Sequence, residues 1–336
     1  MNYIGSKLKL SSWIENEIAS YVGRNNLKDL TFCDLFAGTG IVGRTFKNKV
    51  AKVISNDIEE YSYILNRNYI ENSSLIYDKE NYINELNNLP LVEDGFIYQN
   101  YCMGSGSERQ YFSDYNGKKI DTIRQKIEEW KINNIITDDL YYFLLASLLE
   151  SADKVANTAS VYGAFLKHIK KSASKDLVLE SAEFEITNNM NDVYNCDANE
   201  LIKKIKGDIL YLDPPYNQRQ YGANYHLLNT IIKYDDFIPR GKTGMRDYNK
   251  SLYCSKKEVY TSFEELIKNA DFKYIFLSYN NEGLMSLDDI NSIMRTYGKY
   301  IPDTRQTYSR FKADKTENRN HKAVNTFEYL HILEKN

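Results

Sequence analysis

The chain has 336 residues and four cysteines, with 43 Lys and Arg residues against 46 Asp and Glu residues. A chain of this length can bury a core that folds without disulfides or a structural metal, which excludes the small disulfide-rich and metal-stapled classes. The formal net charge of -3 provides no overall attraction to nucleic acid, so a polyanionic partner would have to contact local basic patches.

The cysteines, Cys33, Cys102, Cys196 and Cys254, form no C-x-x-C pair and no cluster with histidine. Their spacing indicates neither a disulfide framework nor a zinc site, and it favours an intracellular, reducing compartment. The sequence has no apolar run of about 18 residues and no charged-then-apolar leader, so we expect neither a membrane span nor a secretory signal.

The N-terminal part of the chain shows the pattern of a βαβ unit. Apolar residues at helical spacing predict an amphipathic helix over 7–22. The apolar run from Leu30 to Phe36 then stops at a glycine turn, which is typical of a buried strand. A helix over 41–47 and a second strand over 51–57 follow, and this order predicts a parallel sheet.

The middle of the chain differs from both ends. Residues 61–103 are rich in Asn and Tyr with weak periodicity, and two helices are predicted over 120–132 and 138–152. Further strands are predicted over 183–187, 193–197, 208–213 and 273–278. Residues 217–260 are irregular. The pattern therefore indicates an α/β fold interrupted by an insert.

A glycine loop followed by an acid forms the first candidate site. Asp34-Leu35-Phe36-Ala37-Gly38-Thr39-Gly40 is followed by Asp57, 17 residues beyond Gly40. The glycines let the backbone pass close to a ligand, and an acid at the tip of the next strand can hold ribose hydroxyls, which suits an adenosine-containing cofactor. With Gly43 the dinucleotide fingerprint G-x-G-x-x-G is formally complete, so NAD binding stays open, as does a tight turn without a ligand.

The second candidate site is Asp213-Pro214-Pro215-Tyr216, which directly follows an apolar strand. The carboxylate therefore lies at the carboxyl end of a parallel strand, where α/β enzymes place their chemistry. The prolines fix the backbone and lack N–H groups, so their carbonyl oxygens are left as acceptors. An acid, a rigid carbonyl and an aromatic face together form a receptor for a planar amine.

Four motifs occur in one order along the chain: Asn2-Tyr3-Ile4-Gly5-Ser6-Lys7, Asp34 to Gly40, Asp57, and Asp213 to Tyr216. With them the chain resembles the Dam-related (D12 class) DNA adenine N6-methyltransferases, which use S-adenosylmethionine. The resemblance covers both ends of the chain and not the middle, and its most specific motif is D-P-P-Y. It implies a Rossmann-like SAM-dependent methyltransferase core over 1–65 and 185–336, with a mostly parallel twisted sheet and helices on both faces. The mainly helical insert, 66–184, would recognise the target, as in the arrangement called alpha.

The resemblance also implies roles for single residues. Those expected at the cofactor are Tyr3 and Lys7 near its methionine end, Asp34, Phe36, Gly38 and Gly40 around the methionine moiety, Asp57 at the ribose, Asp197 at the adenine amino group, and Asp213. Lys7 could instead be a solvated lysine at the start of a helix. Asp197 could cap the helix that follows it, a role compatible with binding the cofactor.

The predicted mechanism follows from the weak nucleophilicity of adenine N6, whose lone pair is delocalised into the ring. We expect Asp213 and the Pro214 carbonyl to accept hydrogen bonds from the two N6 protons, which turns the lone pair toward the methyl group. Tyr216 would stack on the base after its extrusion from the duplex, because the target atom cannot be reached inside it. Positioning supplies most of the rate, and no metal is needed.

Three segments concentrate positive charge, and they predict contacts with double-stranded DNA. The candidates are Lys167, Lys170 and Lys171 in the first segment, Arg219, Tyr221, Arg240 and Arg246 in the second, and the basic residues of 305–322 in the third. A solvated charged surface is the alternative for each. The resemblance further implies a prokaryotic or phage-infected cytoplasm and a restriction-modification system with a separate cognate endonuclease.

Three other functions stay open at this point. The enzyme could methylate a different planar amine, namely cytosine N4, adenine in RNA or a protein glutamine, although Asp213 as the first residue of the tetrapeptide favours adenine. A nicotinamide-dependent dehydrogenase lacks support, since the sequence offers no acid for hydride transfer paired with a substrate clamp. The third is a non-catalytic nucleic-acid-binding module of the same fold, which the intact Asp213 to Tyr216 motif disfavours.

Overall fold

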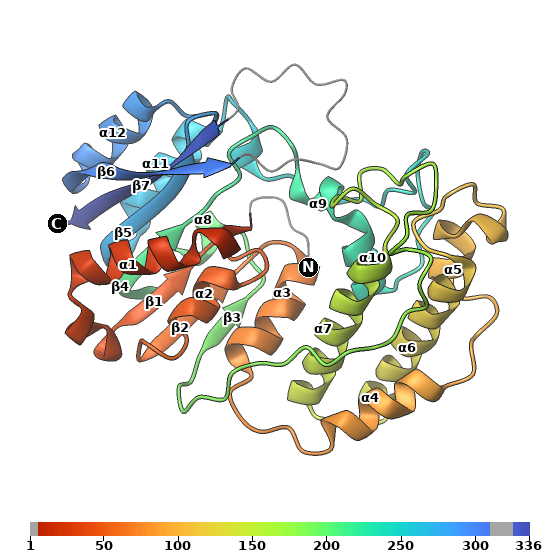
Figure 1. The fold of residues 1–336 in the computed structure, drawn as a ribbon. Helices are drawn as coiled ribbons and strands as arrows, with labels where there is room; N and C mark the ends of the chain where they lie inside the picture. The colour runs from red at the N-terminus through yellow and green to blue at the C-terminus, as the bar shows by residue number, and fades with distance from the viewer. Residues whose placement is uncertain (1–5, 310–324) are drawn as a thin grey trace. The chain divides into compact units, whose positions relative to one another are not determined.

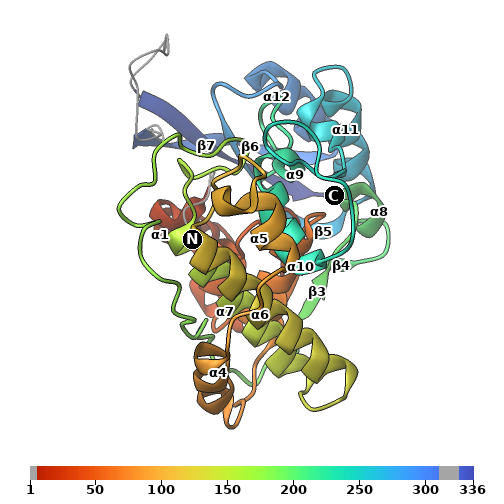
Figure 2. The same cartoon turned by 90° about the vertical axis from the view of Figure 1, so that its right-hand side faces the viewer.

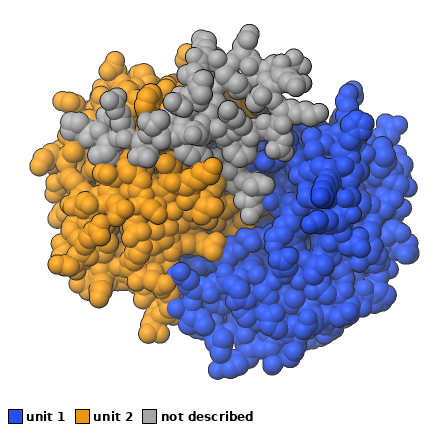
Figure 3. All heavy atoms as spheres, viewed as in Figure 1, with its two compact units in different colours: residues 1–4, 67–186, 221–248 blue, residues 5–66, 187–220, 249–336 orange. Residues whose placement is uncertain are grey.

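The computed structural model describes residues 6–309 and 325–336, with the backbone alone at 302–309 and 325–326. The chain divides into two compact units (Figure 3). Unit 1 contains residues 67–186 and 221–248, and unit 2 contains the described residues before 67, residues 187–220 and those after 248. No helix in the described ranges has the length and apolar character needed to cross a bilayer.

Unit 2 is built on a seven-stranded sheet with the order β3-β2-β1-β4-β5-β7-β6 (Figure 1). Strands β1 to β5 run parallel, whereas β7 is antiparallel to both β5 and β6. The strands are β1 (Thr31–Asp34), β2 (Lys52–Asn56), β3 (Asp192–Tyr194), β4 (Lys206–Leu212), β5 (Asp271–Asn280), β6 (Gly298–Ser309) and β7 (Asn325–Lys335). The predicted, mostly parallel Rossmann-like sheet is confirmed.

Side chains of β5 alternate between two covered faces of this sheet, as the two-residue period of a strand requires. Ile275 and Leu277 join the apolar core formed with α8, α11 and α12. Tyr274 and Phe276 point to the other face, where the ring of Tyr21 on α1 meets both edge-on, at centroid distances of 5.8 and 6.1 Å. The helices of unit 2 are α1 (Ser11–Val22), α2 (Ile41–Phe46), α3 (Glu60–Asn66), α8 (Ala198–Leu201), α11 (Val259–Asn269) and α12 (Leu287–Thr296).

Unit 1 is mainly helical, and its described residues contain no named strand. Its helices are α4 (Lys79–Asn88), α5 (Phe96–Tyr101), α6 (Asp114–Ile132), α7 (Asp138–Val155), α9 (Tyr221–Asn224) and α10 (His226–Lys233). Helices α6 and α7 pack along one another (Figure 2). Both have side-chain N-caps, because the hydroxyls of Ser113 and Thr137 accept hydrogen bonds from backbone N–H groups of the first turn.

One predicted strand is wrong. Residues 183–187 form no strand, and most of their side chains are exposed. The adjoining Ala182 shows the reason, because its backbone is bound by helix side chains of unit 1: its N–H donates to Ser147 Oγ and its carbonyl accepts from Asn68 Nδ2. The backbone here has side-chain partners in place of a neighbouring strand.

Several boundaries also differ from the prediction. The long helix begins at Ser11, and Lys7–Lys9 form a separate 3-10 turn. The units change at 66/67 and 186/187, one or two residues from the predicted limits, but residues 221–248, which we assigned to the core, belong to unit 1. Apolar packing explains this assignment, because buried residues of α10, including Leu227, Leu228 and Ile231, pack toward α6 and α7 of the same unit.

Candidate active site

Four acids singled out in the sequence follow four neighbouring strands of unit 2. Asp197 follows β3, Asp57 follows β2, Asp34 ends β1 and Asp213 follows β4. These strands are adjacent and parallel, in the order β3-β2-β1-β4. Since the carboxyl ends of parallel strands share one edge, the acids lie along this edge in the order Asp197, Asp57, Asp34, Asp213.

The glycine loop after β1 adopts a conformation that side chains disfavour. Gly38 and Gly40 have φ values of +53° and +74°, in the left-handed region. At Gly40 a Cβ atom would also lie 2.6 Å from Asn66 Oδ1. The Gly38 carbonyl accepts hydrogen bonds from Ser62 Oγ and from Asn66 Nδ2, the latter at 3.1 Å. Two side chains of α3 (Glu60–Asn66) therefore hold the loop in place.

Asp57 is bound to the same loop, although it lies 19 residues away from Gly38. Its Oδ2 accepts a hydrogen bond from the Gly38 N–H at 2.8 Å, and its Oδ1 accepts one from the Glu59 N–H at 2.9 Å. Burial raises the pKa of Asp57, while these N–H bonds oppose the shift. The structure thus brings the predicted loop and the predicted acid together, and the contact with a ribose stays a prediction.

Asp34 is a buried acid, 1% exposed, and only one of its two carboxylate oxygens accepts a hydrogen bond from a described residue. Its Oδ2 accepts a hydrogen bond from the Gly43 N–H at 3.0 Å, but no described residue binds its Oδ1. Burial raises the pKa of Asp34 to about 7, and the Gly43 N–H opposes the shift. A buried carboxylate oxygen without a partner is unusual, and a ligand with an N–H or ammonium group would satisfy it.

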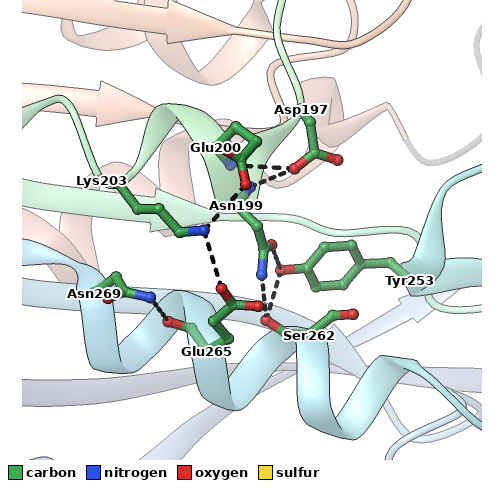
Figure 4. A network of polar contacts seen from close by, with 8 residues as sticks. All are labelled: Asp197, Asn199, Glu200, Lys203, Tyr253, Ser262, Glu265 and Asn269. Carbon is green, nitrogen blue, oxygen red and sulfur yellow. Dashed lines mark hydrogen bonds and ion pairs between the residues drawn. The ribbon is translucent and has the colours of Figure 1, made fainter.

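Asp197 caps α8, the alternative role that the sequence left open. Its Oδ1 accepts hydrogen bonds from the N–H groups of Asn199 at 2.9 Å and Glu200 at 3.2 Å. Figure 4 shows the second carboxylate oxygen turned away from the helix. The cap fixes the exposed carboxylate at the edge of the sheet, and the predicted contact with an adenine stays untested.

Sequence reasoning missed Tyr253, which links two of the predicted residues. Its buried hydroxyl donates to Asn199 Oδ1 at 2.8 Å, in the first turn of the helix that Asp197 caps (Figure 4). Its ring meets the ring of Phe36 edge-on, with centroids 5.0 Å apart. Tyr253 lies in a 3-10 turn, Leu252–Cys254, within the region 217–260 that we predicted to be irregular, and no spacing pattern there distinguishes it from other tyrosines.

Asn56, the last residue of β2, was also missed. Its Nδ2 donates to the carbonyls of Leu35 at 3.1 Å and Cys196 at 3.2 Å, and its Oδ1 accepts from the Cys196 N–H at 3.1 Å. One buried amide therefore joins the loops that follow β1 and β3. Its position directly before Asp57 is the only signal in the sequence.

The Asp213 carboxylate is paired with Lys7, whose Nζ lies 2.8 Å from Asp213 Oδ1. Lys7 is 6% exposed, so the solvated-lysine alternative is wrong. Burial raises the pKa of Asp213 to about 6, and the Lys7 ammonium limits that rise. Burial by itself would lower the pKa of Lys7, but the nearby acids hold it well above its usual value.

Glu328 is a third member of this cluster that sequence reasoning missed. Its Oε1 lies 3.2 Å from Lys7 Nζ and accepts a hydrogen bond from Ser278 Oγ at 2.6 Å. Glu328 is buried on β7, far along the chain from the motifs that contain Lys7 and Asp213. No motif or spacing in the sequence indicates this contact.

The other residues of the tetrapeptide are firmly held. Pro214 is buried, and Tyr216 is half-buried against the apolar core of unit 2. The Tyr216 carbonyl accepts a hydrogen bond from the Leu284 N–H at 3.0 Å. Stacking of its ring on a base stays a prediction. Tyr3 lies outside the described residues, as does most of the basic segment 305–322, whose remaining side chains are not described either.

Two of the basic residues predicted to bind DNA are paired with acids of their own unit. Arg240 binds Asp247, with a shortest distance of 2.9 Å, and both side chains are largely exposed. Arg246 binds Asp235 through two hydrogen bonds of 2.9 and 2.8 Å. These carboxylates offset the positive charge that the sequence alone attributes to the segment.

The remaining candidates differ in exposure. Lys167, Lys171 and Arg219 are exposed. Lys170 donates to the Thr158 carbonyl at 2.7 Å. The ring of Tyr221 stacks near that of Tyr225, with centroids 6.1 Å apart. The contacts of all these residues with DNA stay predictions.

A family model described as D12 class N6 adenine-specific DNA methyltransferase matches residues 3–293. The chain belongs to this family. This finding confirms the resemblance drawn from the motifs, and the protein is a site-specific DNA methyltransferase that acts on adenine. It sets aside the nicotinamide-dependent, non-catalytic and other-amine alternatives.

Named relatives agree with this assignment. The chain is 66% identical over 336 residues to the type II methyltransferase M.NlaIII of Neisseria lactamica, covering all of this chain and 99% of that protein. It is 41% identical to the type II methyltransferase M.CviAII of Paramecium bursaria Chlorella virus 1, with 93% of each chain covered. The type II methyltransferase M.FokI of Planomicrobium okeanokoites is 40% identical, and the match spans all of this chain but 53% of that relative.

Proposed function

We propose that the protein transfers a methyl group from S-adenosylmethionine to adenine N6 in a short sequence of double-stranded DNA. The observation that carries the proposal is the order of the acids Asp197, Asp57, Asp34 and Asp213 along one sheet edge. The parts of S-adenosylmethionine follow the same order: adenine at Asp197, ribose at Asp57 and methionine at Asp34. The target amine then meets Asp213, next to the reacting methyl group.

The donor set suits this cofactor. Asp34 has a buried oxygen without a described partner, which an ammonium group can satisfy, and Asp57 is placed for hydroxyl groups. Gly38 and Gly40 keep the loop free of side chains where the backbone approaches the ligand. When bound, S-adenosylmethionine supplies an electrophilic methyl group on a sulfonium centre.

The chain's own residues position and polarise the amine. Asp213 is ionised above its pKa of about 6, so at neutral pH it accepts a hydrogen bond from one N6 proton. The Pro214 carbonyl accepts the other proton, since the proline backbone is rigid. These two bonds draw the nitrogen toward tetrahedral geometry, and Tyr216 stacks on the extruded base. Holding the reactants in line supplies most of the acceleration.

Recognition of the DNA sequence is the proposed role of unit 1, residues 67–186 and 221–248. Lys167 and Lys171 are its best candidates for phosphate contacts, since both are exposed and no ion pair among the described residues involves either ammonium group. The type II names of the relatives support a restriction-modification system with a separate cognate endonuclease, and the cytoplasm of a prokaryote or phage-infected cell stays the predicted location.

The test uses the full chain with labelled S-adenosylmethionine and plasmid DNA, followed by nucleoside analysis. We expect N6-methyladenine from the wild type and a loss of about 100-fold or more in rate for Asp213→Ala, the scale of removing one transition-state hydrogen bond. The matched control is Asp271→Ala, which should keep wild-type activity. Asp271 is an exposed acid at the start of β5, at the end of the strand away from the site. Label in RNA or protein only, or full activity of Asp213→Ala, would refute the proposal.

A second measurement tests the basic residues. Double substitution of Lys167 and Lys171 by alanine should weaken DNA binding uniformly across sequences and reduce its salt dependence, because phosphate contacts release counterions. The rate at saturating DNA should stay at the wild-type level. An unchanged salt dependence would remove these two lysines from the interface.

A further inference from the structure

The cluster around Lys7 spans three neighbouring strands. Asp213 follows β4, Ser278 lies on β5 and Glu328 lies near the start of β7. Because β7 is antiparallel to β5, with Asn280 opposite Glu328, its beginning lies at the same edge as the ends of β4 and β5. The Lys7 ammonium is shared there between Asp213 Oδ1 at 2.8 Å and Glu328 Oε1 at 3.2 Å.

Glu328 is itself anchored, because Ser278 Oγ donates to the same Oε1 at 2.6 Å. Glu328 is 5% exposed, and burying a charge is costly unless it is paired. Replacing a whole buried ion pair by well-packed apolar residues of similar volume is often harmless to stability. A second acid on a lysine that already has Asp213 as partner is therefore poorly explained by folding alone.

Resting on the proposed role of Asp213, we propose that Glu328 is a positioning residue that acts on Asp213 through Lys7. Glu328 fixes the direction in which the ammonium points and takes part of its hydrogen-bonding capacity. Lys7 then orients the Asp213 carboxylate without neutralising it fully. Asp213 keeps a strong acceptor oxygen for the N6 proton.

The sign of the pH effect follows from the titratable groups that face Asp213. They are Lys7 from the 3-10 turn, Glu328 from β7, Asp34 at the end of β1 and Tyr211 on β4. Glu328 raises the pKa of Asp213, and Lys7 lowers it. Replacing Glu328 by a neutral residue should therefore lower the pKa of Asp213. The fall of kcat/KM on the acid side of the pH profile (the acid limb) should then move to lower pH.

The experiment compares Glu328→Gln, Glu328→Asp and Ser278→Ala with the wild type, with kcat and the pH profile of kcat/KM measured on plasmid DNA. For Glu328→Gln we expect kcat to fall about tenfold, the scale of one charge-assisted hydrogen bond, and the acid limb to shift to lower pH. Glu328→Asp, which keeps the charge, should return the acid limb to its wild-type position. Glu334→Gln, another acid of β7, is the matched control and should change neither quantity.

A wild-type kcat and acid limb in folded Glu328→Gln would overturn the inference, even if its melting temperature fell. If Glu328→Gln does not fold, Ser278→Ala decides: a kcat lowered about threefold supports the inference, and a wild-type kcat contradicts it. Failure of the proposed function is seen separately, because Asp213→Ala would then stay active whatever Glu328 does.

Discussion

Replacing Lys7 by methionine keeps most of the volume of the side chain but removes the ammonium that two buried carboxylates share. Asp213 and Glu328 are left without the partner that lies 2.8 and 3.2 Å from them. Breaking a buried ion pair by removing one member costs about 3–5 kcal/mol of folding free energy, because the remaining charge is uncompensated. We expect Lys7→Met to lose stability of this size at a pH where Asp213 is ionised.

The loss should depend on pH in a defined direction. The ammonium lowers the pKa of Asp213, so without it that pKa rises above about 6. An acid whose pKa is higher in the folded state than in the unfolded chain binds more protons when folded, and its stability rises as pH falls between the two values. The stability of Lys7→Met relative to the wild type should therefore recover in part as the pH falls from about 8 to about 5.5. The recovery should be roughly 1.4 kcal/mol for each pH unit by which the substitution raises the pKa of Asp213.

Urea unfolding of the wild type and Lys7→Met at these two pH values measures the deficit directly. Lys9→Met is the matched control, since Lys9 is exposed in the same 3-10 turn and should show no deficit at either pH. The acid limb of kcat/KM should also move to higher pH in Lys7→Met. A deficit of equal size at both pH values, with an unmoved acid limb, would refute the electrostatic reasoning.

Three further predictions follow from the site. In the wild type, kcat/KM should fall as the pH drops through about 6, because Asp213 must be ionised to accept the N6 proton, and a profile flat to below pH 5 would contradict this. Gly40→Ala should destabilise by about 2 kcal/mol or more and raise KM for S-adenosylmethionine, because its Cβ would meet Asn66 Oδ1 at 2.6 Å. Gly106 has a φ of +82°, and a Cβ added there would have no atom within 4 Å, so Gly106→Ala measures the backbone strain alone. An equal loss of stability in Gly40→Ala and Gly106→Ala would show that the contact with Asn66 is irrelevant. Tyr253→Phe should raise KM for S-adenosylmethionine about threefold to tenfold with kcat unchanged, since it loses only the hydroxyl that binds Asn199 beside the proposed adenine site. An unchanged KM would exclude this role.

The sequence by itself determined the parts of the site that are contiguous. Local pattern predicted that two motifs lie at strand ends, because apolar runs lead directly into Asp34 to Gly40 and Asp213 to Tyr216. The same motifs carried the resemblance to the family. Short apolar runs also identified the strands from β1 to β5, apart from the false strand at 183–187. There, residues with a strand-like pattern pair with side chains of helices, a choice that depends on which neighbours the fold supplies.

Only the tertiary structure decided which distant residues complete the site. Strand β7 lies beside β5 although Glu328 lies 48 residues after Asn280 in the sequence, and this pairing places a second acid on Lys7. Tyr253 and Asn56 likewise connect segments that are remote along the chain. A local pattern reports whether a residue faces a core, but not which strands become neighbours, because many strand orders bury the same faces equally well. Contacts between a lysine near the N-terminus and a glutamate near the C-terminus exist only once that order is chosen.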